Sequence, residues 1–133
     1  MEQRNIVLVS GSGVYGAVSK YITEFAAAFR ELGYHTVILD GKAVTACLVP
    51  APAVDGRDVV TIEGVGCDGK LDPVQEAVLE NHALQCGFCT PGFIMSAKAL
   101  LDENPDATRE EIRRAISGNL CRCTGYEQLT DAI

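Results

Sequence analysis

Hydrophobic positions recur with helical spacing through the second half of the chain, in four short segments. Each segment follows a residue that is typical of a helix N-cap, and two of these residues are followed by proline at the first helical position. The other two belong to Thr-x-x-Glu capping boxes. The expected N-cap residues are Asp72, Thr90, Thr108 and Thr124. We therefore expect four helices in residues 71–133, packed as two antiparallel hairpins in a small bundle.

The first half of the chain contains strand-like segments instead. Those with strand composition are Ile6–Ser10, Thr36–Leu39, Ala43–Val49 and Val59–Ile62, and a segment with helical character, Lys20–Leu32, follows the first of them. The dipeptide Asp40-Gly41 lies between two strands and is a strong hairpin signal. The pattern predicts an α+β fold, in which a small atypical or truncated β-containing segment, residues 1–70, precedes the helical unit of residues 71–133.

Composition narrows the classes of function. Apolar residues make up 47% of the 133 residues, which argues against overall disorder, and the net charge of −7 argues against nucleic acid or an anionic membrane as a partner. No apolar run approaches the roughly 20 residues of a membrane helix, and the N-terminus lacks the basic region and apolar core of a signal peptide. We therefore expect a cytoplasmic protein, in which cysteines are more often metal ligands than disulfides.

Four of the six cysteines form two close pairs near the C-terminus. Cys86 and Cys89 have C-x2-C spacing, and Cys121 and Cys123 follow after 31 residues with C-x-C spacing. Each pair lies between two expected helices, so a bundle would bring both pairs to one end. Four thiolates select zinc or an iron–sulfur cluster. The spacing alone leaves both possibilities open, so a structural zinc module with four cysteine ligands is the alternative. A further cysteine, Cys67, is expected to be a small buried hydrophobic residue.

A glycine-rich segment near the N-terminus supports another hypothesis. Gly11–Gly16 has the pattern G-x-G-x-x-G between an expected strand and helix, and Asp40 ends the next strand, as in dinucleotide-binding units. The interval from Gly16 to Asp40 is 24 residues, which is somewhat long, and there is room for one β-α-β unit only. The hairpin signal at Asp40 also competes with this hypothesis. A tight glycine turn within a structural β-α-β piece is the preferred interpretation, with nucleotide binding as the alternative.

Several segments of residues 36–133 match one family closely. They are Thr36–Cys47, Thr61–Gly64, Leu71–Glu76, Gln85–Gly92, Ala99–Pro105 and Gly118–Tyr126. Two of them contain the highly specific motifs Gln-Cys-Gly-Phe-Cys-Thr-Pro-Gly and Asn-Leu-Cys-Arg-Cys-Thr-Gly-Tyr. On these segments the chain resembles the small iron–sulfur subunit of the molybdenum hydroxylases, which include xanthine dehydrogenase, aldehyde oxidase and aerobic carbon monoxide dehydrogenase. The resemblance covers about three quarters of the chain.

The resemblance implies a helical C-terminal domain that holds a 2Fe-2S cluster. Its ligands would be Cys86, Cys89, Cys121 and Cys123, and Gln85 and Cys123 would approach the pterin held by a molybdopterin-binding large subunit. The cluster would relay electrons from that subunit toward an FAD-binding medium subunit. The chain itself would bind no organic substrate, so no catalytic residue is expected in it.

Two further residues are candidates for contact with the cofactor. Gly87 would let the backbone approach the cluster, or would simply be a turn glycine. Arg122 would pair with the anionic cluster or with a partner, or would be solvated. Backbone N–H groups of both cysteine segments are expected to donate to the sulfurs and to raise the reduction potential.

The resemblance stops before residue 36. Members of the family carry another 2Fe-2S cluster in a β-grasp domain, held by three closely spaced cysteines and a fourth further on. Cys47 matches the fourth, His35 stands at the position of the third, and the first two are absent. One cysteine and one histidine do not hold such a cluster. We therefore expect one 2Fe-2S cluster rather than two. Residues 1–35 are instead similar to part of a nucleotide-binding α/β protein.

Overall fold

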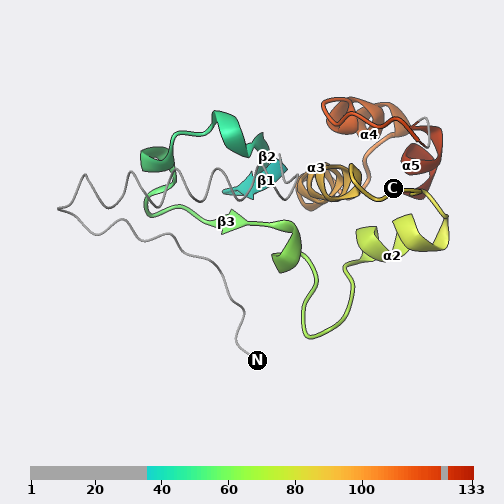
Figure 1. Ribbon diagram of the computed structural model, residues 1–133, viewed down its shortest axis with the longest axis horizontal. Coiled ribbons are helices and arrows are strands. Elements are labelled where there is room, and N and C mark those ends of the chain that lie inside the picture. The colour runs from blue at the N-terminus through green and yellow to red at the C-terminus, as the bar shows by residue number, and fades with distance from the viewer. Residues whose placement is uncertain (1–35, 124–125) are drawn as a thin grey trace.

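The computed structural model describes residues 36–123 and 126–133 of the chain. These residues form a mixed α+β structure in which an antiparallel sheet of three strands is followed by four α-helices. The elements are β1 (Thr36–Leu39), β2 (Lys42–Thr45), β3 (Val59–Val60), α2 (Pro73–Glu80), α3 (Thr90–Glu103), α4 (Arg109–Ile116) and α5 (Glu127–Ala132). The sheet lies on one side of α3, and the other three helices lie on its other side (Figure 1).

Some of the sequence predictions lie outside the described residues. They concern the strand Ile6–Ser10, the helix Lys20–Leu32, the glycine-rich segment Gly11–Gly16 and His35. In the described part of the chain, no helix is both long enough and apolar enough to cross a membrane.

The hairpin between β1 and β2 turns at Asp40 and Gly41, as predicted. Both residues have positive φ angles, 46° and 80°, which a two-residue type I′ turn requires. The carboxylate of Asp40 accepts hydrogen bonds from Nε of Arg57 at 2.6 Å and from the backbone N–H of Asp58 at 3.0 Å. Asp40 thereby fixes the segment that leads into β3. This structural role weakens its assignment as a ribose ligand.

Two strands are shorter than the sequence predicts. β2 ends at Thr45, and residues expected to continue it form the 3-10 helix Ala46–Leu48. β3 ends at Val60 and is followed by the 3-10 helix Ile62–Gly64. A third 3-10 helix, Ala51–Val54, lies between the other two along the chain. Strand composition identifies residues that fit a pleated surface, but the point at which pairing stops depends on the neighbouring strand.

Helices α2 and α4 begin with the caps that the sequence predicts. The side chain of Asp72 accepts from the N–H of Val74 at 2.9 Å, and the side chain of Gln75 accepts from the N–H of Asp72 at 2.9 Å. In α4, Thr108 and Glu111 form the predicted capping box. These starts are predictable because each partner lies within three residues of the cap.

The starts of α3 and α5 differ from the prediction. Thr90 is the first residue of α3 rather than its N-cap, and Cys89 precedes it without a side-chain cap. α5 begins at Glu127, because Tyr126 has a φ angle of 73° and is not helical. The expected N-cap Thr124 lies outside the described residues. In both helices a residue of a cysteine motif therefore stands at the start, Thr90 in α3 and Tyr126 before α5.

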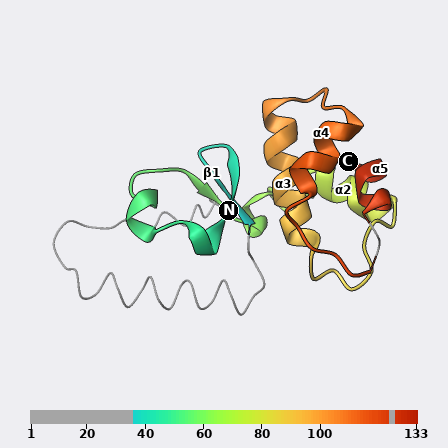
Figure 2. The same cartoon turned by 90° about the horizontal axis from the view of Figure 1, so that it is seen from above.

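α3 forms the centre of the described structure (Figure 2). Its Phe93 packs in a cluster of buried residues from α2, α4 and α5, and its Met95 and Ala99 pack against Ile38 of β1. The largest fully buried side chains are Phe93, Met95, Ile116, Leu129 and Val78. The contact of Ile38 with α3 crosses the proposed division between residues 70 and 71.

Candidate metal centre

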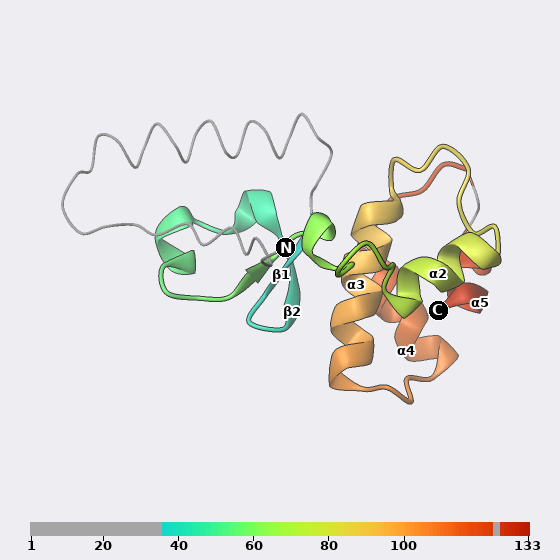
Figure 3. The same ribbon diagram turned by 90° about the horizontal axis from the view of Figure 1, so that it is seen from below.

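Two loops from distant parts of the chain run side by side next to the helices (Figures 2 and 3). The first joins α2 to α3 and carries Cys86 and Cys89, and the second joins α4 to α5 and carries Cys121 and Cys123. The Sγ atom of Cys123 lies 3.5 Å from that of Cys86. The structure therefore brings together the four cysteines that the sequence singles out.

The four thiols contact one another as two pairs and differ in acidity. Cys123 lies against Cys86, and Cys121 hydrogen-bonds with Cys89. The backbone N–H of Phe88, followed by the thiol of Cys123, lowers the pKa of Cys86, whereas the bond to Cys86 raises the pKa of Cys123. Burial, followed by the bond to Cys121, raises the pKa of Cys89 to about 11. Binding of a metal must release the thiol protons, because the thiolate is the ligand.

Backbone N–H groups of both loops donate to cysteine sulfurs. The N–H of Cys123 donates to Sγ of Cys121 at 3.4 Å, and the N–H of Phe88 donates to the sulfur of Cys86. Such donors stabilise negative charge on sulfur. Gly87 has a φ angle of 80°, and a Cβ atom there would meet nothing within 4 Å. Backbone conformation, rather than close approach, therefore accounts for glycine at this position.

The other two predicted cofactor contacts lie at the surface of the same loops. Gln85 Nε2 donates to the backbone oxygen of Cys123 at 3.4 Å and so joins the two loops. Arg122 is exposed, and its side chain makes no hydrogen bond or ion pair with the other described residues. Both side chains therefore lie beside the cysteines at a surface that a second protein can reach.

Tyr126 contributes to the site in a way that sequence reasoning missed. Its hydroxyl accepts a hydrogen bond from the backbone N–H of Cys121 at 2.8 Å. Its ring meets that of Phe93 edge to face, with the centroids 5.9 Å apart. Tyr126 therefore attaches the second cysteine loop to the core of α3. Its position at the end of a specific motif was the available signal, but the contact with Phe93 depends on tertiary structure.

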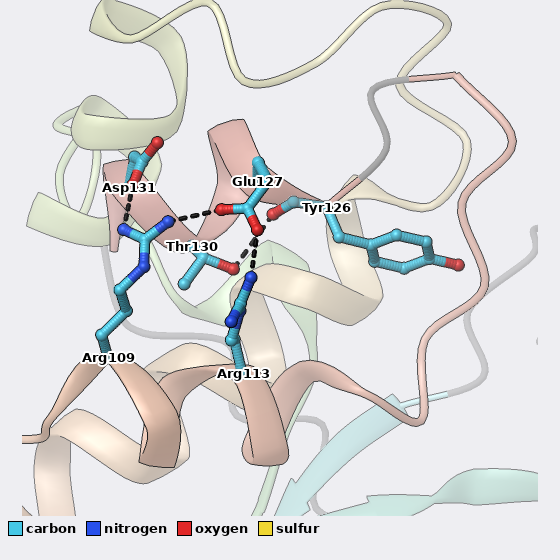
Figure 4. Close-up of polar contacts among 6 residues, drawn as sticks. All are labelled: Arg109, Arg113, Tyr126, Glu127, Thr130 and Asp131. Carbon is cyan, nitrogen blue, oxygen red and sulfur yellow. Dashed lines mark hydrogen bonds and ion pairs between the residues drawn. The ribbon is translucent and has the colours of Figure 1, made fainter.

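Ion pairs hold α5 against α4 (Figure 4). Arg109 pairs with both Glu127 and Asp131, and Arg113 pairs with Glu127. The ring of Tyr126 points away from these ion pairs (Figure 4). The charged side chains are half exposed, so each pair contributes little to stability by itself. Together they anchor the helix that follows Tyr126.

Two further cysteines lie outside the site. Cys47 and Cys67 are both exposed. The prediction that Cys67 is buried is wrong, because its backbone pairs with that of Lys70 across a tight surface turn through Asp68 and Gly69. The sequence contains the Asp-Gly hairpin signal for this turn.

The donor set has the chemistry of a 2Fe-2S site, with four cysteines that contact one another in two pairs. Among the described residues, no group of three or more His, Cys, Asp or Glu side chains is placed to hold one metal ion. The sulfurs instead meet as two contacting pairs, and backbone N–H groups already face two of them. Four cysteine thiolates are the usual ligands of a 2Fe-2S cluster.

Comparisons with known proteins match this part of the chain. Residues 61–133 match the family described as 2Fe-2S binding domain. The chain is 54% identical over 101 residues to the nicotine 6-hydroxylase small subunit of Paenarthrobacter nicotinovorans, which covers 76% of this chain and 61% of that protein. It is 45% identical over 105 residues to the xanthine dehydrogenase iron-sulfur-binding subunit of Escherichia coli O157:H7, which covers 77% of this chain and 66% of that protein. The chain thus spans less than two thirds of the length of either relative.

A solved structure agrees with these matches. Quinoline 2-oxidoreductase from Pseudomonas putida 86 superposes with a TM-score of 0.69 at 45% sequence identity, over 73% of this chain and 60% of that one. The resemblance inferred from the motifs is confirmed, because relatives are named as the small subunit of a hydroxylase and the iron-sulfur-binding subunit of a dehydrogenase, and the chain matches the 2Fe-2S binding domain. The matched family spans more than half of the chain and includes both cysteine pairs. This chain belongs to the 2Fe-2S binding domain family.

Proposed function

We propose that the chain is the electron-transfer iron–sulfur subunit of a molybdenum-containing hydroxylase or dehydrogenase. The observation that carries this proposal is the convergence of two cysteine pairs, 37 residues apart between Cys86 and Cys123, within the 2Fe-2S binding domain. Similar proteins are named as the small subunit of a nicotine 6-hydroxylase and the iron-sulfur-binding subunit of a xanthine dehydrogenase, and this supports the proposal. The chain contributes no substrate chemistry of its own and passes electrons from a molybdopterin site toward FAD.

In this proposal, Cys86, Cys89, Cys121 and Cys123 hold the cluster as thiolates. When bound, a 2Fe-2S cluster accepts and passes on one electron. The backbone N–H groups of Phe88 and Cys123 stabilise negative charge on the sulfurs, and this favours the reduced state. The hydrogen bond from Gln85 holds the two loops together at the surface.

The partners would meet the chain at this surface. Phe88 and Leu120 are apolar yet 72% and 89% exposed, and each lies next to a cysteine of the site. Large exposed apolar side chains near a functional group are typical of protein interfaces. We assign this surface, with Gln85 and Arg122, to a molybdopterin-binding large subunit. An FAD-binding medium subunit would receive the electrons.

Two structural predictions and one on location accompany this proposal. Helices α2 to α5 act as one four-helix unit around the site, supported by the contacts of α5 with both α2 and α4. The N-terminal segment, residues 1–70, is atypical and lacks the other cluster of the family, and its strand β1 packs against α3. The protein works in the cytoplasm, where thiols stay reduced.

The proposal is tested by measuring iron and acid-labile sulfide per chain, with a visible spectrum, on protein purified without oxygen. We expect about two irons and two sulfides per chain. Cys121→Ser should remove most of both, whereas Cys47→Ser, at an exposed cysteine outside the site, should leave both unchanged. Zinc in the absence of acid-labile sulfide would refute the electron-transfer function and would favour a structural zinc module. About four irons would show that the other cluster is present.

A further inference from the structure

Asn119 joins three elements at the base of the second cysteine loop. Its Oδ1 accepts a hydrogen bond from the hydroxyl of Thr36 in β1 at 3.3 Å. Its Nδ2 donates to the hydroxyl of Ser96 in α3 at 2.9 Å and to the backbone oxygen of Ile116 in α4 at 3.3 Å. The amide thus uses three of its four hydrogen-bonding positions on partners from three different elements, which are distant from one another in the sequence.

One partner of Asn119, Ser96, lies on the helix that begins at the first cysteine pair. Cys89 is the N-cap of α3, and Ser96 lies in the second turn of that helix. Cys121 follows Asn119 by two residues. The hydrogen bond between Asn119 and Ser96 therefore connects the loop that carries one cysteine pair to the helix that carries the other.

The amide also fits into a space that only glycine leaves open. A Cβ atom at Gly92, in the first turn of α3, would lie 2.4 Å from Oδ1 of Asn119. Carbon and oxygen atoms cannot approach so closely without displacement. Ser96 follows Gly92 by four residues, so both lie on one face of the helix. The side chain of Asn119 therefore lies directly on this face of α3.

We propose that Asn119 is a positioning residue, which sets the separation of the two cysteine pairs by fixing the second loop on α3. This inference rests on the proposed function, in which the four cysteines hold one cluster. Thr36 extends the same network to the sheet, so β1 contributes to the geometry of a site that it does not reach. Groups that orient ligands without touching the metal affect both its retention and its redox properties.

The test uses the full chain loaded with its cluster, and follows iron release to a chelator, visible circular dichroism and the reduction potential. Asn119→Ala should speed iron release by about tenfold, as loss of an outer partner of metal ligands commonly does, and should change the circular dichroism and the potential. Ser96→Ala and Thr36→Val remove one hydrogen bond each and should give smaller changes of the same kind. They supply the result if Asn119→Ala does not fold.

Two matched controls separate positioning from general stability. Asn81→Ala removes an amide whose side chain, among the described residues, bonds the backbone oxygen of Ala77 in the helix that it caps, and it should leave iron release unchanged. Gly92→Ala should behave like Asn119→Ala, whereas Gly118→Ala, where an added Cβ meets nothing within 4 Å, should behave like wild type.

The outcomes are distinct. Iron release, spectrum and potential of Asn119→Ala that equal those of wild type would overturn the inference, as would equal acceleration by Asn81→Ala. If the wild-type chain holds no cluster, the proposed function itself fails, and iron and sulfide analysis of the wild type detects this before any variant is compared.

Discussion

Tyr126→Phe removes a single oxygen atom and leaves the aromatic ring in place. The lost oxygen accepts a 2.8 Å hydrogen bond from the N–H of Cys121, a half-buried residue. A net hydrogen bond is worth about 1 kcal/mol, and a polar group left without a partner costs about 1–3 kcal/mol. Because water partly reaches Cys121, we expect the free energy of unfolding to fall by about 1–2 kcal/mol.

The assay is urea denaturation followed by circular dichroism, on wild type and variants with the same iron content. With a slope of about 1–3 kcal/mol per molar urea, the midpoint should fall by roughly 0.5–1 M. Tyr126→Leu should lower it further, because the edge-to-face contact with Phe93 is also lost. A midpoint for Tyr126→Phe that equals that of wild type, with a reduced midpoint for Tyr126→Leu, would refute the role of the hydroxyl.

Three other perturbations test acidity, salt and pH. In the cluster-free chain near neutral pH, iodoacetamide should label Cys86 faster than Cys123, because the pKa of Cys86 is lowered and that of Cys123 is raised; equal labelling rates by mass spectrometry would contradict this. Glu127→Gln breaks the ion pairs to α4 and should lower the urea midpoint in low salt but less in about 1 M salt; a salt-independent loss would exclude ion pairing as its cause. Arg57 holds the pKa of Asp40 below its ordinary value in the folded chain, so this carboxylate stabilises the fold above the pKa of the unfolded chain and stops doing so as the pH falls through the folded value. The difference in urea midpoint between wild type and Asp40→Asn should therefore shrink below about pH 4, and a constant difference would count against this linkage.

The sequence predicted those helix starts that depend on short-range bonds. The caps at Asp72 and Thr108 hold because each cap and its partners are three residues apart or fewer. The start of α5 was placed too early, because Tyr126 has a positive φ angle and its side chain contacts Cys121 and Phe93, which no local pattern predicts. The start of α3 was predicted one residue too late: Thr90 was expected to be the N-cap, whereas it is the first helical residue and follows Cys89, which makes no side-chain capping bond.

The site was predictable to the same extent. Cysteine spacing and motif identity sufficed to select the four cysteines, whose sulfurs the fold then gathers. The contributions of Tyr126 and Asn119 were not predictable, because they come from hydrogen bonds and ring contacts across the fold. The bond between Thr36 and Asn119 spans 83 residues of sequence, which no local pattern reports.

α3 packs against the sheet and begins at a cysteine loop. The direction of its side chains around the helix axis therefore restricts the number of residues that the helix can have. The helix has 14 residues, about 21 Å at 1.5 Å per residue. One residue inserted ahead of Met95 would rotate everything after it by about 100° relative to Cys89. Met95 and Ala99 would then turn away from Ile38, even though no existing side chain had been replaced. Surface loops in this domain can change length at modest cost, whereas the first half of α3 must keep its residue count.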